Sequence, residues 1–253
     1  MNSNNNRRRS KGAVAYAFLG VVLILILLIL GISIFMKVMV IDVSGSSSYS
    51  DDEVITASGI SIGDNILFID AGAAARRLRV AKPYISEAEI ISELPDTIRI
   101  IVKESTAIAA VEYGNSVLLI NSSGKVLSQT DVLQKDLIEI RGFVPAETEV
   151  GNRLRTVSES ETQLVSMTDV LTAFEKAGIT DKVSYLDVTY ISNIKFGYSE
   201  RFTVILGGSS NVNHKLNQLP VMIEDIDEKH SPDVSGEIDM SDTSGEWRFK
   251  QTT

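Results

Sequence analysis

The sequence contains no cysteine among its 253 residues. Disulfide bonds, thiolate catalysis and metal sites with cysteine ligands are therefore excluded. The part of the chain that we expect to be exported must then be stabilised by burial of a hydrophobic core alone. Its length permits such a core.

Histidine is almost as scarce, since only His214 and His230 occur. The motifs HExxH and GxGxxG and the phosphate-binding P-loop are all missing. Both histidines stand in polar surroundings without a neighbouring nucleophile motif, which disfavours a Ser-His-Asp arrangement. The acidic run at Asp225, Asp227 and Glu228 lacks the glycine-turn spacing of a calcium loop. The sequence thus predicts no catalytic residues, no cofactor or cofactor-binding residues, and no metal ligands.

Net positive charge is also lacking, because the formal net charge is −9. With the four cationic residues before the first apolar run set aside, the remainder of the chain carries −13. Such an acidic surface disfavours binding to nucleic acid and electrostatic docking on anionic lipid.

One long hydrophobic run is present, Ala13–Met36, and its twenty-four residues include no charge. As a helix it would be roughly 36 Å long, whereas a bilayer core of about 30 Å needs ~20 apolar residues. The cationic segment RRRSK precedes it at positions 7–11. By the positive-inside rule, residues 1–12 form a cytoplasmic tail and the chain after the run is exported.

Two other interpretations of this run are weaker. A cleaved signal peptide has a shorter apolar region and a small-residue cleavage site, which the sequence ISIFMKVMV does not provide. A buried core helix of this length without a polar face would be unusual. The sequence therefore predicts residues 13–36 as an uncleaved transmembrane helix that contacts the lipid bilayer, in a single-pass type II protein.

The region 37–104 follows the order strand, helix, helix, strand, strand. The expected strands are 39–43, 84–93 and 97–104, and the expected helices are 51–58 and 71–80. Ser50 and Glu53 form a capping box at the start of the first helix, and Gly59 is a left-handed stop at its end. Asp70 can cap the second helix. The pattern predicts a three-stranded sheet with both helices on one face.

The region 105–250 is rich in strands and predicts a second domain. Strands are expected over 107–113, 117–120, 126–128, 137–140, 183–188, 193–197, 201–206, 236–240 and 245–250. One helix is expected after a second capping box, Ser158 with Glu161. It carries a hydrophobic stripe made of Leu164, Met167, Leu171 and Phe174. Another is expected over 215–227, where Pro220 conflicts with the helical pattern. The predicted fold class is α+β, with helices packed on a mainly antiparallel sheet.

Several ordered pieces of both regions are similar to one family. In the first region they are Val40–Ser44, Ser58–Leu67, Leu78, Pro83–Ile85, Ala88–Ile90 and Leu94–Ile100 with Val102 and Glu104. In the second region they are Leu118–Val126, Val204–Gly207, Lys215–Leu216 and Gly236–Met240. In this order and spacing, behind an anchor of this orientation, they resemble the FtsQ/DivIB family of bacterial division proteins.

The sequence departs from the family pattern at two places. Ser105 and Ala107 stand where the family often has an arginine and then a proline. Ser241 and Asp242 stand where many members carry a basic and an aromatic residue. The second departure bears on any partner contact that those side chains would make.

The resemblance implies a POTRA domain at 37–104, a β-domain at 105–250 and a non-enzymatic role. Such proteins are divisome scaffolds in the cell membrane at the septum, where they recruit and regulate septal peptidoglycan synthesis. The implied partners are division proteins of the FtsB/DivIC and FtsL types, with no nucleic acid and no small-molecule substrate. The POTRA-like part is expected to contribute to recruitment through helix 51–58 and strand 84–93.

In the family, the end of the β-domain adds a strand of the FtsB-type partner to its sheet edge. A final strand has one unpaired row of main-chain groups that suits this use. The predicted partner-binding residues are Gly245, Glu246, Trp247, Arg248 and Phe249. The two aromatic residues share one face of the strand and could anchor a partner. Alternatively, they only pack on the core of their own domain.

Two other function classes stay open. A membrane-anchored exported cell-wall enzyme would present a deep pocket that converges on a histidine or on paired carboxylates. A POTRA-bearing structural protein of a sporulation or export complex would differ in its depletion phenotype.

Overall fold

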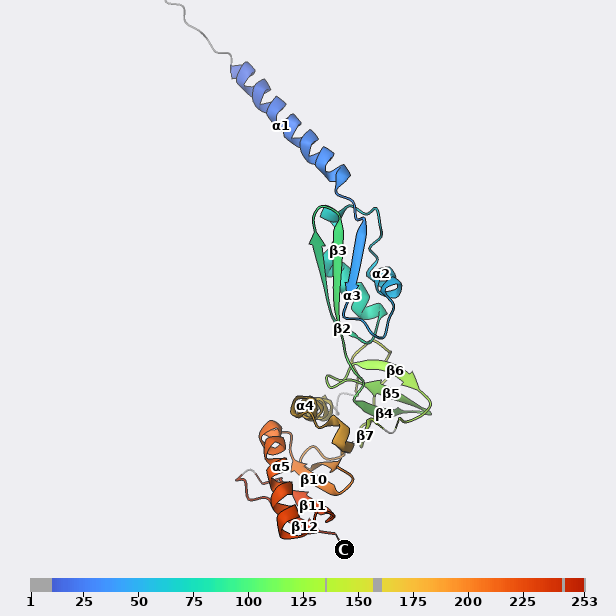
Figure 1. Ribbon diagram of the computed structural model, residues 1–253, viewed down its shortest axis with the longest axis vertical. Helices are drawn as coiled ribbons and strands as arrows, with labels where there is room; N and C mark the ends of the chain where they lie inside the picture. The colour runs from blue at the N-terminus through green and yellow to red at the C-terminus, as the bar shows by residue number, and fades with distance from the viewer. Residues whose placement is uncertain (1–10, 135, 157–160, 243, 253) are drawn as a thin grey trace, which may run out of the picture. The chain divides into compact units, whose positions relative to one another are not determined.

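The computed structural model describes residues 11–134, 136–156, 161–242 and 244–252, without the side chains of residues 11–14 and 32–34. The described chain is a mixed α+β protein (Figure 1). It divides into two compact units. Unit 1 comprises the chain up to Leu78 together with Glu87–Lys103, and unit 2 comprises Arg79–Ser86 together with the chain from Glu104 onward.

The first element is the helix α1, Lys11–Phe35, which is 25 residues long. Most of the predicted cytoplasmic tail, residues 1–10, lies outside the described residues. Among the residues that are described, no helix is long and apolar enough to cross a membrane. The anchor predicted at residues 13–36 is therefore not confirmed.

A three-stranded sheet follows α1 in the chain. Its elements and the helices beside it are β1 Val40–Ser44, α2 Asp51–Ser58, the 3-10 helix η1 Ile66–Phe68, α3 Ala71–Ala81, β2 Ile85–Glu93 and β3 Thr97–Glu104. β3 lies between the other two strands and pairs in parallel with β1. The predicted order of elements is confirmed.

Local capping signals act as the sequence predicts. The Ser50 side chain accepts the N–H of Glu53, and the Glu53 carboxylate accepts the N–H of Ser50, so the capping box is complete. Gly59 ends α2 with a φ of 71°, a left-handed conformation that glycine adopts without strain. Asp70 accepts the N–H of Ala73 at 2.8 Å and caps α3. The boundaries of both helices thus follow from residues within one turn of them.

Only one face of this sheet is buried. Along β3, Ile98, Ile100 and Val102 are buried, whereas Ile101 and Lys103 are exposed. This period of two is that of a strand with one solvated face.

The second sheet has nine strands among the described residues. They are β4 Ala109–Tyr113, β5 Ser116–Ile120, β6 Val126–Thr130, β7 Ile138–Arg141, β8 Val183–Asp187, β9 Ile194–Tyr198, β10 Phe202–Gly207, β11 Gly236–Asp239 and β12 Arg248–Gln251. Their spatial order is β12-β11-β10-β9-β8-β7-β4-β5-β6. Three pairs are parallel, namely β10 with β11, β4 with β7, and β7 with β8. Between β7 and β8, and between β10 and β11, the chain passes through a helix, as parallel neighbours require.

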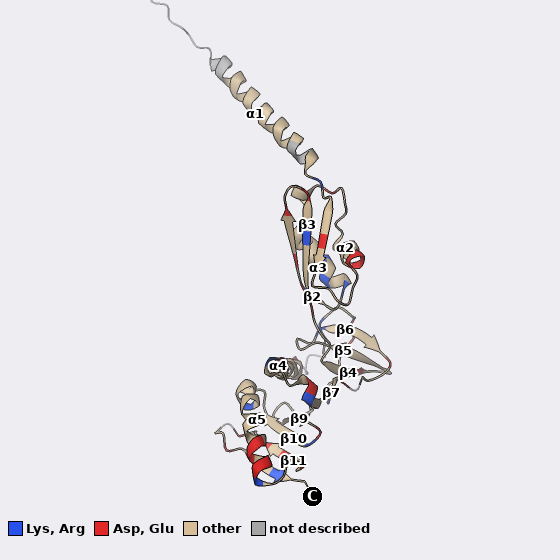
Figure 2. Ribbon diagram, in the orientation of Figure 1, with Lys and Arg blue, Asp and Glu red and all other residues tan. Residues whose placement is uncertain are grey.

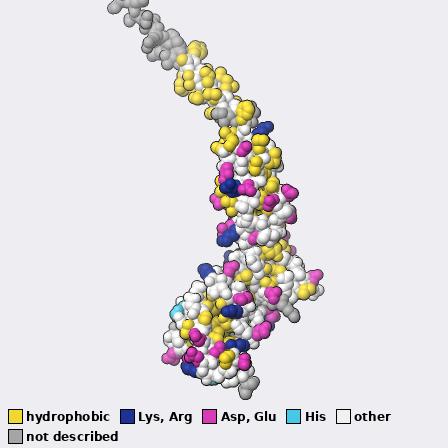
Figure 3. All heavy atoms as spheres, viewed as in Figure 1, with side chains coloured by type: hydrophobic (Ala, Val, Ile, Leu, Met, Phe, Trp, Pro, Cys, Tyr) yellow, Lys and Arg dark blue, Asp and Glu magenta, His cyan; other side chains and the backbone are white. Residues whose placement is uncertain are grey.

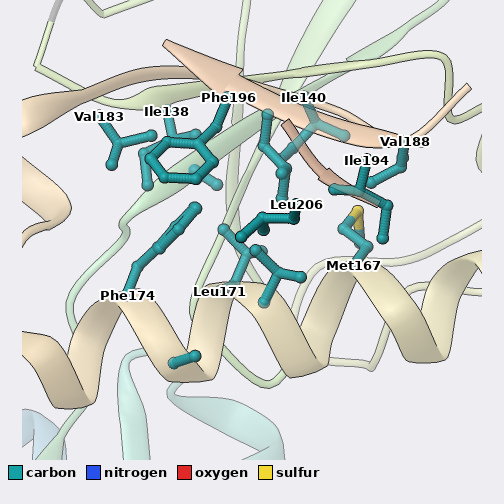
Figure 4. Packing of buried hydrophobic residues seen from close by; sticks show 14 of the residues in the cluster. Ile138, Ile140, Met167, Leu171, Phe174, Val183, Val188, Ile194, Phe196 and Leu206 are labelled. Carbon is teal, nitrogen blue, oxygen red and sulfur yellow. The ribbon is translucent and has the colours of Figure 1, made fainter. Parts of the chain in front are cut away.

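The helix α4, Glu161–Ala177, packs on this sheet. Its predicted stripe is confirmed, because Leu164, Met167, Leu171 and Phe174 are all buried. Figure 4 shows Met167, Leu171 and Phe174 pointing at strand residues, and the ring of Phe174 lies 4.9 Å from that of Phe196. Ser158, the predicted cap, lies outside the described residues.

The helix α5, Val212–Lys229, connects β10 to β11. Pro220 lies inside it on the exposed side, so the helix continues through the residue that conflicts with its pattern. Leu216, Leu219 and Ile226 are buried against the sheet.

Candidate partner-binding edge

The second sheet ends at β12, which has β11 on one side and is the outermost strand in the spatial order (Figure 1). The pair is antiparallel, with Arg248 opposite Asp239 and Gln251 opposite Gly236. An outermost strand turns one row of N–H and C=O groups away from the sheet. This is the geometry that strand addition by another chain requires.

One hydrogen bond fixes which groups point outward. The N–H of Thr252 donates to the carbonyl oxygen of Ser235 at 3.0 Å, and the register places these two residues opposite each other. Antiparallel strands alternate between hydrogen-bonded and non-hydrogen-bonded pairs. The main-chain groups of Lys250 therefore also face β11, whereas those of Phe249 and Gln251 face outward.

The side chain of Phe249 holds β12 against its own unit. It is half-buried and packs on the hydrophobic core, while Arg248 and Lys250 on either side are exposed. The Phe249 ring centroid lies 6.1 Å from that of Phe202 and 5.4 Å from that of His230. The backbone at this edge is thus presented by a strand whose inner face is fixed.

Trp247 also contacts its own unit. It is half-buried against the same core, and its ring centroid lies 6.0 Å from that of His214. The indole N–H donates to the Asp242 carbonyl oxygen at 3.2 Å. Both predicted aromatic anchors therefore pack on the domain that carries them, and a role for them in partner binding stays a prediction.

The last strand begins later than the sequence predicts. The expected range is 245–250, whereas β12 covers Arg248–Gln251. Gly245 has a φ of 87°, and its carbonyl oxygen accepts the N–H of Trp247 at 3.0 Å. A positive φ turns the chain and prevents an extended strand from starting there.

The predicted residues are consequently split between two kinds of structure. Gly245, Glu246 and Trp247 lie in the connection, and Arg248 and Phe249 lie in β12. The sequence-based set omits Gln251, which is exposed and turns its main-chain groups outward. The signal that could have found it is the glycine turn, because it delays the strand and carries it past residue 250.

Two carboxylates lie near this edge, Asp239 at the end of β11 and Asp242 in the connection to β12. Asp239 accepts the N–H of Ser241 at 2.9 Å. Hydrogen bonds from Ser241 hold the pKa of Asp239 below its ordinary value, and the nearby charge of Arg248 acts in the same direction. Hydrogen bonds from Ser244 likewise lower the pKa of Asp242. Both carboxylates are therefore ionised beside this edge at neutral pH.

Two cationic side chains connect α5 to β10 and to the residue before it. Lys215 is buried and donates from Nζ to the Leu206 carbonyl oxygen at 2.6 Å, and burial lowers the pKa of Lys215. Arg201 forms an ion pair with Asp227 on α5 and donates from Nε to the Val234 carbonyl oxygen at 3.1 Å. In the ribbon of Figure 2, red marks the acidic residues along α5. These contacts position the segment that leads into β11.

The histidines have structural neighbours. His214 is exposed and lines a groove with Asp169 and Lys176 of α4, and its ring packs with Trp247. His230 packs with Phe249. Among the described residues, no group of three or more His, Asp and Glu side chains could hold a metal ion.

Comparison with known proteins matches both parts of the chain. Residues 36–105 match the family model of the POTRA domain of FtsQ type. The cell division protein DivIB of Clostridium acetobutylicum is 28% identical over 202 residues, which cover 78% of this chain and 79% of that protein. DivIB of Clostridium botulinum is 28% identical over 179 residues, covering 70% and 68%.

More distant matches include the cell division protein FtsQ of Agrobacterium fabrum, which is 30% identical over 88 residues, or 35% of this chain and 27% of that protein. The solved structure of the major extracytoplasmic domain of the trans isomer of DivIB from Geobacillus stearothermophilus is similar at 13% identity and a TM-score of 0.32. It covers 50% of this chain and 97% of that one. Relatives along most of the chain, together with the POTRA match, support the assignment of this protein to the FtsQ/DivIB family of bacterial cell division proteins.

Proposed function

We propose that the protein is a non-enzymatic scaffold of the division machinery at the septum. It binds partners of the FtsB/DivIC and FtsL types, and through them it recruits and regulates septal peptidoglycan synthesis. Relatives that are named cell division proteins support a role in division. The partners and the regulation are the finer part of the proposal.

The observation that carries the proposal is the outer edge of β12. A partner strand would pair with the outward N–H and C=O groups of Phe249 and Gln251 and extend the sheet by one strand. The exposed side chains of Arg248 and Lys250 lie on the face opposite the core and would flank that strand. Main-chain pairing would supply affinity, and the flanking side chains would supply selectivity.

The proposal places α1 in the membrane as a single-pass anchor, with the rest of the chain outside the cytoplasm. The support is the uncharged run Ala13–Met36 and the exposure of large apolar side chains on all sides of α1, from Tyr16 to Leu30. A helix that is apolar all round requires an apolar environment. Cations before the run set its orientation.

The POTRA-like region is proposed to assist recruitment. The first turn of α2 presents Asp51, Asp52 and Glu53 to solvent. β2 lies at one edge of its sheet. Removal of residues 45–104 is expected to reduce septal localisation, and unchanged localisation would contradict this part of the proposal.

The decisive test removes one outward N–H group. In Gln251→Pro, the N–H that a partner strand would use is lost, while the inward N–H groups of Lys250 and Thr252 remain. Proline is tolerated on edge strands at such positions. Affinity for the FtsB/DivIC-type ectodomain of the same bacterium, measured by titration calorimetry, is expected to fall about tenfold or more.

The matched control is Gln251→Ala, which removes the side chain but keeps the N–H. It should bind within about twofold of the natural chain, because main-chain pairing carries the contact. Unchanged affinity of Gln251→Pro in a folded protein would exclude this edge as the binding site.

Depletion of the protein in its bacterium is expected to give filaments without septa. Normal growth with failed sporulation would instead favour a structural role in another complex.

A further inference from the structure

Unit 1 exposes large apolar side chains close to the residues that follow α1. We define the junction patch as Met39, Ile62, Leu67, Phe68 and Leu94, all of which are exposed. Phe68 is 80% exposed and Met39 is 69% exposed, fractions at which neither side chain contributes to the core. Figure 3 shows hydrophobic side chains at the surface there. A clustered set of this kind marks an interaction site more often than scattered residues do.

Main-chain hydrogen bonds bring the three segments of the patch together. The N–H of Ile66 donates to the carbonyl oxygen of Met36 at 3.0 Å, and that of Gly63 donates to Val38 at 2.8 Å. On the other side, the N–H of Met39 donates to the carbonyl oxygen of Asp96 at 2.8 Å. The loop that holds η1 and the turn before β3 are therefore both fixed to the first residues after α1.

Neighbouring side chains show that this exposure is specific. Val38 and Ile66 are almost fully buried, while the adjacent Met39 and Leu67 point outward. The Asn65 side chain accepts the N–H of Leu67 at 3.0 Å and caps η1. The same short segments thus fill the core with one side chain and present the next one outside.

We propose that the junction patch inserts into the headgroup region of the lipid bilayer. It would hold the three-stranded sheet of unit 1 against the extracytoplasmic face of the membrane that α1 would cross. This inference rests on the proposed function, because it assumes that α1 is the anchor. Only Met36 and Lys37 separate α1 from Val38, a link of at most about 10 Å. Apolar groups of interfacial segments lie about 5–10 Å deep at the headgroup boundary. The patch is therefore within reach of the surface that α1 would leave.

The charges nearby favour zwitterionic lipid over an anionic surface. Lys37 is exposed at the junction and can contact lipid phosphate. Asp64 accepts the N–H of Ser61 at 2.8 Å, and Asp96 accepts the hydroxyl of Thr97 at 3.0 Å, so both carboxylates serve local turns. Attraction to anionic lipid would need a cationic surface. Insertion of apolar side chains is the interaction that these residues support.

The absence of cysteine makes a direct test simple. Phe68→Cys and Ser47→Cys each introduce a single thiol for an environment-sensitive fluorophore. Ser47 is exposed beyond the far end of β1 and serves as the matched control. The labelled full chains are reconstituted in phosphatidylcholine vesicles with and without lipid that carries a nitroxide quencher on its acyl chain. The label at residue 68 is expected to be quenched at least about threefold more than the label at residue 47.

A second variant checks that the patch acts as one surface. With a fluorophore on Leu94→Cys, the double substitution Leu67→Ser and Phe68→Ser should reduce quenching at residue 94 about twofold or more. All of these side chains are exposed, so the fold should be retained, and circular dichroism verifies it. Equal quenching at residues 68 and 47 would overturn the proposal.

Flotation of the vesicles separates the two levels of inference. If the full chain fails to float with the vesicles, the anchor in the proposed function fails, and this inference falls with it. If the chain floats but the label at residue 68 is not quenched, only the junction patch proposal is overturned. A label at residue 68 that responds to the protein-to-lipid ratio but not to the quencher would indicate a second copy of the chain as the occupant, and it would also overturn the proposal.

Discussion

Gly236 lies directly against Lys250, because the space that a Cβ at position 236 would need is already occupied by the Lys250 carbonyl oxygen. A Cβ at position 236 would also lie only 2.6 Å from the ring of Phe249. Glycine usually weakens a strand. Here it allows the outer strand to approach β11 with its aromatic ring packed on the sheet.

Gly236→Ala is expected to displace β12 and to lower the free energy of unfolding of unit 2 by about 1–3 kcal/mol, as overpacking does elsewhere. Partner affinity should fall with it, because the outward row moves. Fluorescence of Trp247, the one tryptophan of the chain, reports unfolding in urea. Gly208→Ala is the control, since a Cβ there would meet only the Ile191 carbonyl oxygen at 3.8 Å. Equal stability of the two variants would contradict the close approach.

Phe249→Ala is expected to reduce the free energy of unfolding by about 2 kcal/mol, since a partly buried ring is removed from the core. Phe249→Leu should restore most of that loss. If Phe249 acts by packing on its own sheet, leucine restores partner affinity as well. If the ring instead enters a pocket of the partner, leucine restores stability in urea but leaves affinity low in calorimetry. The contacts with Phe202 and His230 predict the first result.

Features set by nearby residues were predictable from the sequence. The capping box of Ser50 and Glu53 and the left-handed Gly59 each depend on one helical turn. The alternation of Ile98 and Ile100 along β3 likewise needs only the period of a strand. These predictions hold because the local signals agree with the packing around them.

Features set by distant residues were not predictable in the same way. The helical pattern of α5 does not indicate that Lys215 is buried, because its partner is the Leu206 carbonyl oxygen on β10. The start of β12 depends on the turn at Gly245. Which groups face outward depends on the pairing of Thr252 with Ser235, and register between strands is a long-range property.

The stability of unit 2 is expected to depend on pH through Asp239. Its folded-state pKa is depressed, so its contribution is fully present above the unfolded value of about 3.9 and is lost as pH falls through the folded pKa. Asp239→Asn should therefore be less stable than the natural chain at pH 7, and the difference should shrink below about pH 4. Urea midpoints between pH 7 and pH 3 measure it.

The hydrogen bonds that lower the pKa of Asp239 provide a second control. Ser241→Ala removes the side-chain hydrogen bond but keeps the main-chain N–H that Asp239 accepts. It should reproduce part of the pH dependence of Asp239→Asn. A difference between Asp239→Asn and the natural chain that stays constant from pH 7 to pH 3 would show that ionisation of this carboxyl does not stabilise the fold.

In unit 1, Arg77 is expected to stabilise the end of α2. Its Nε and Nη2 atoms both donate to the Ser58 carbonyl oxygen, at 2.9 and 2.7 Å. A cation at a helix C-terminus also interacts favourably with the helix dipole. Arg77→Met should therefore lower the local free energy of opening by about 1 kcal/mol, and Arg77→Lys should recover only part of it, because lysine lacks the forked donors. Amide hydrogen exchange over residues 55–59 should accelerate about fivefold in Arg77→Met.

The control is Arg76→Met, which removes the same charge from the adjacent position and leaves the contact between Arg77 and Ser58 in place. Equal acceleration in both variants would mean that net charge, and not the paired hydrogen bonds, stabilises the end of the helix.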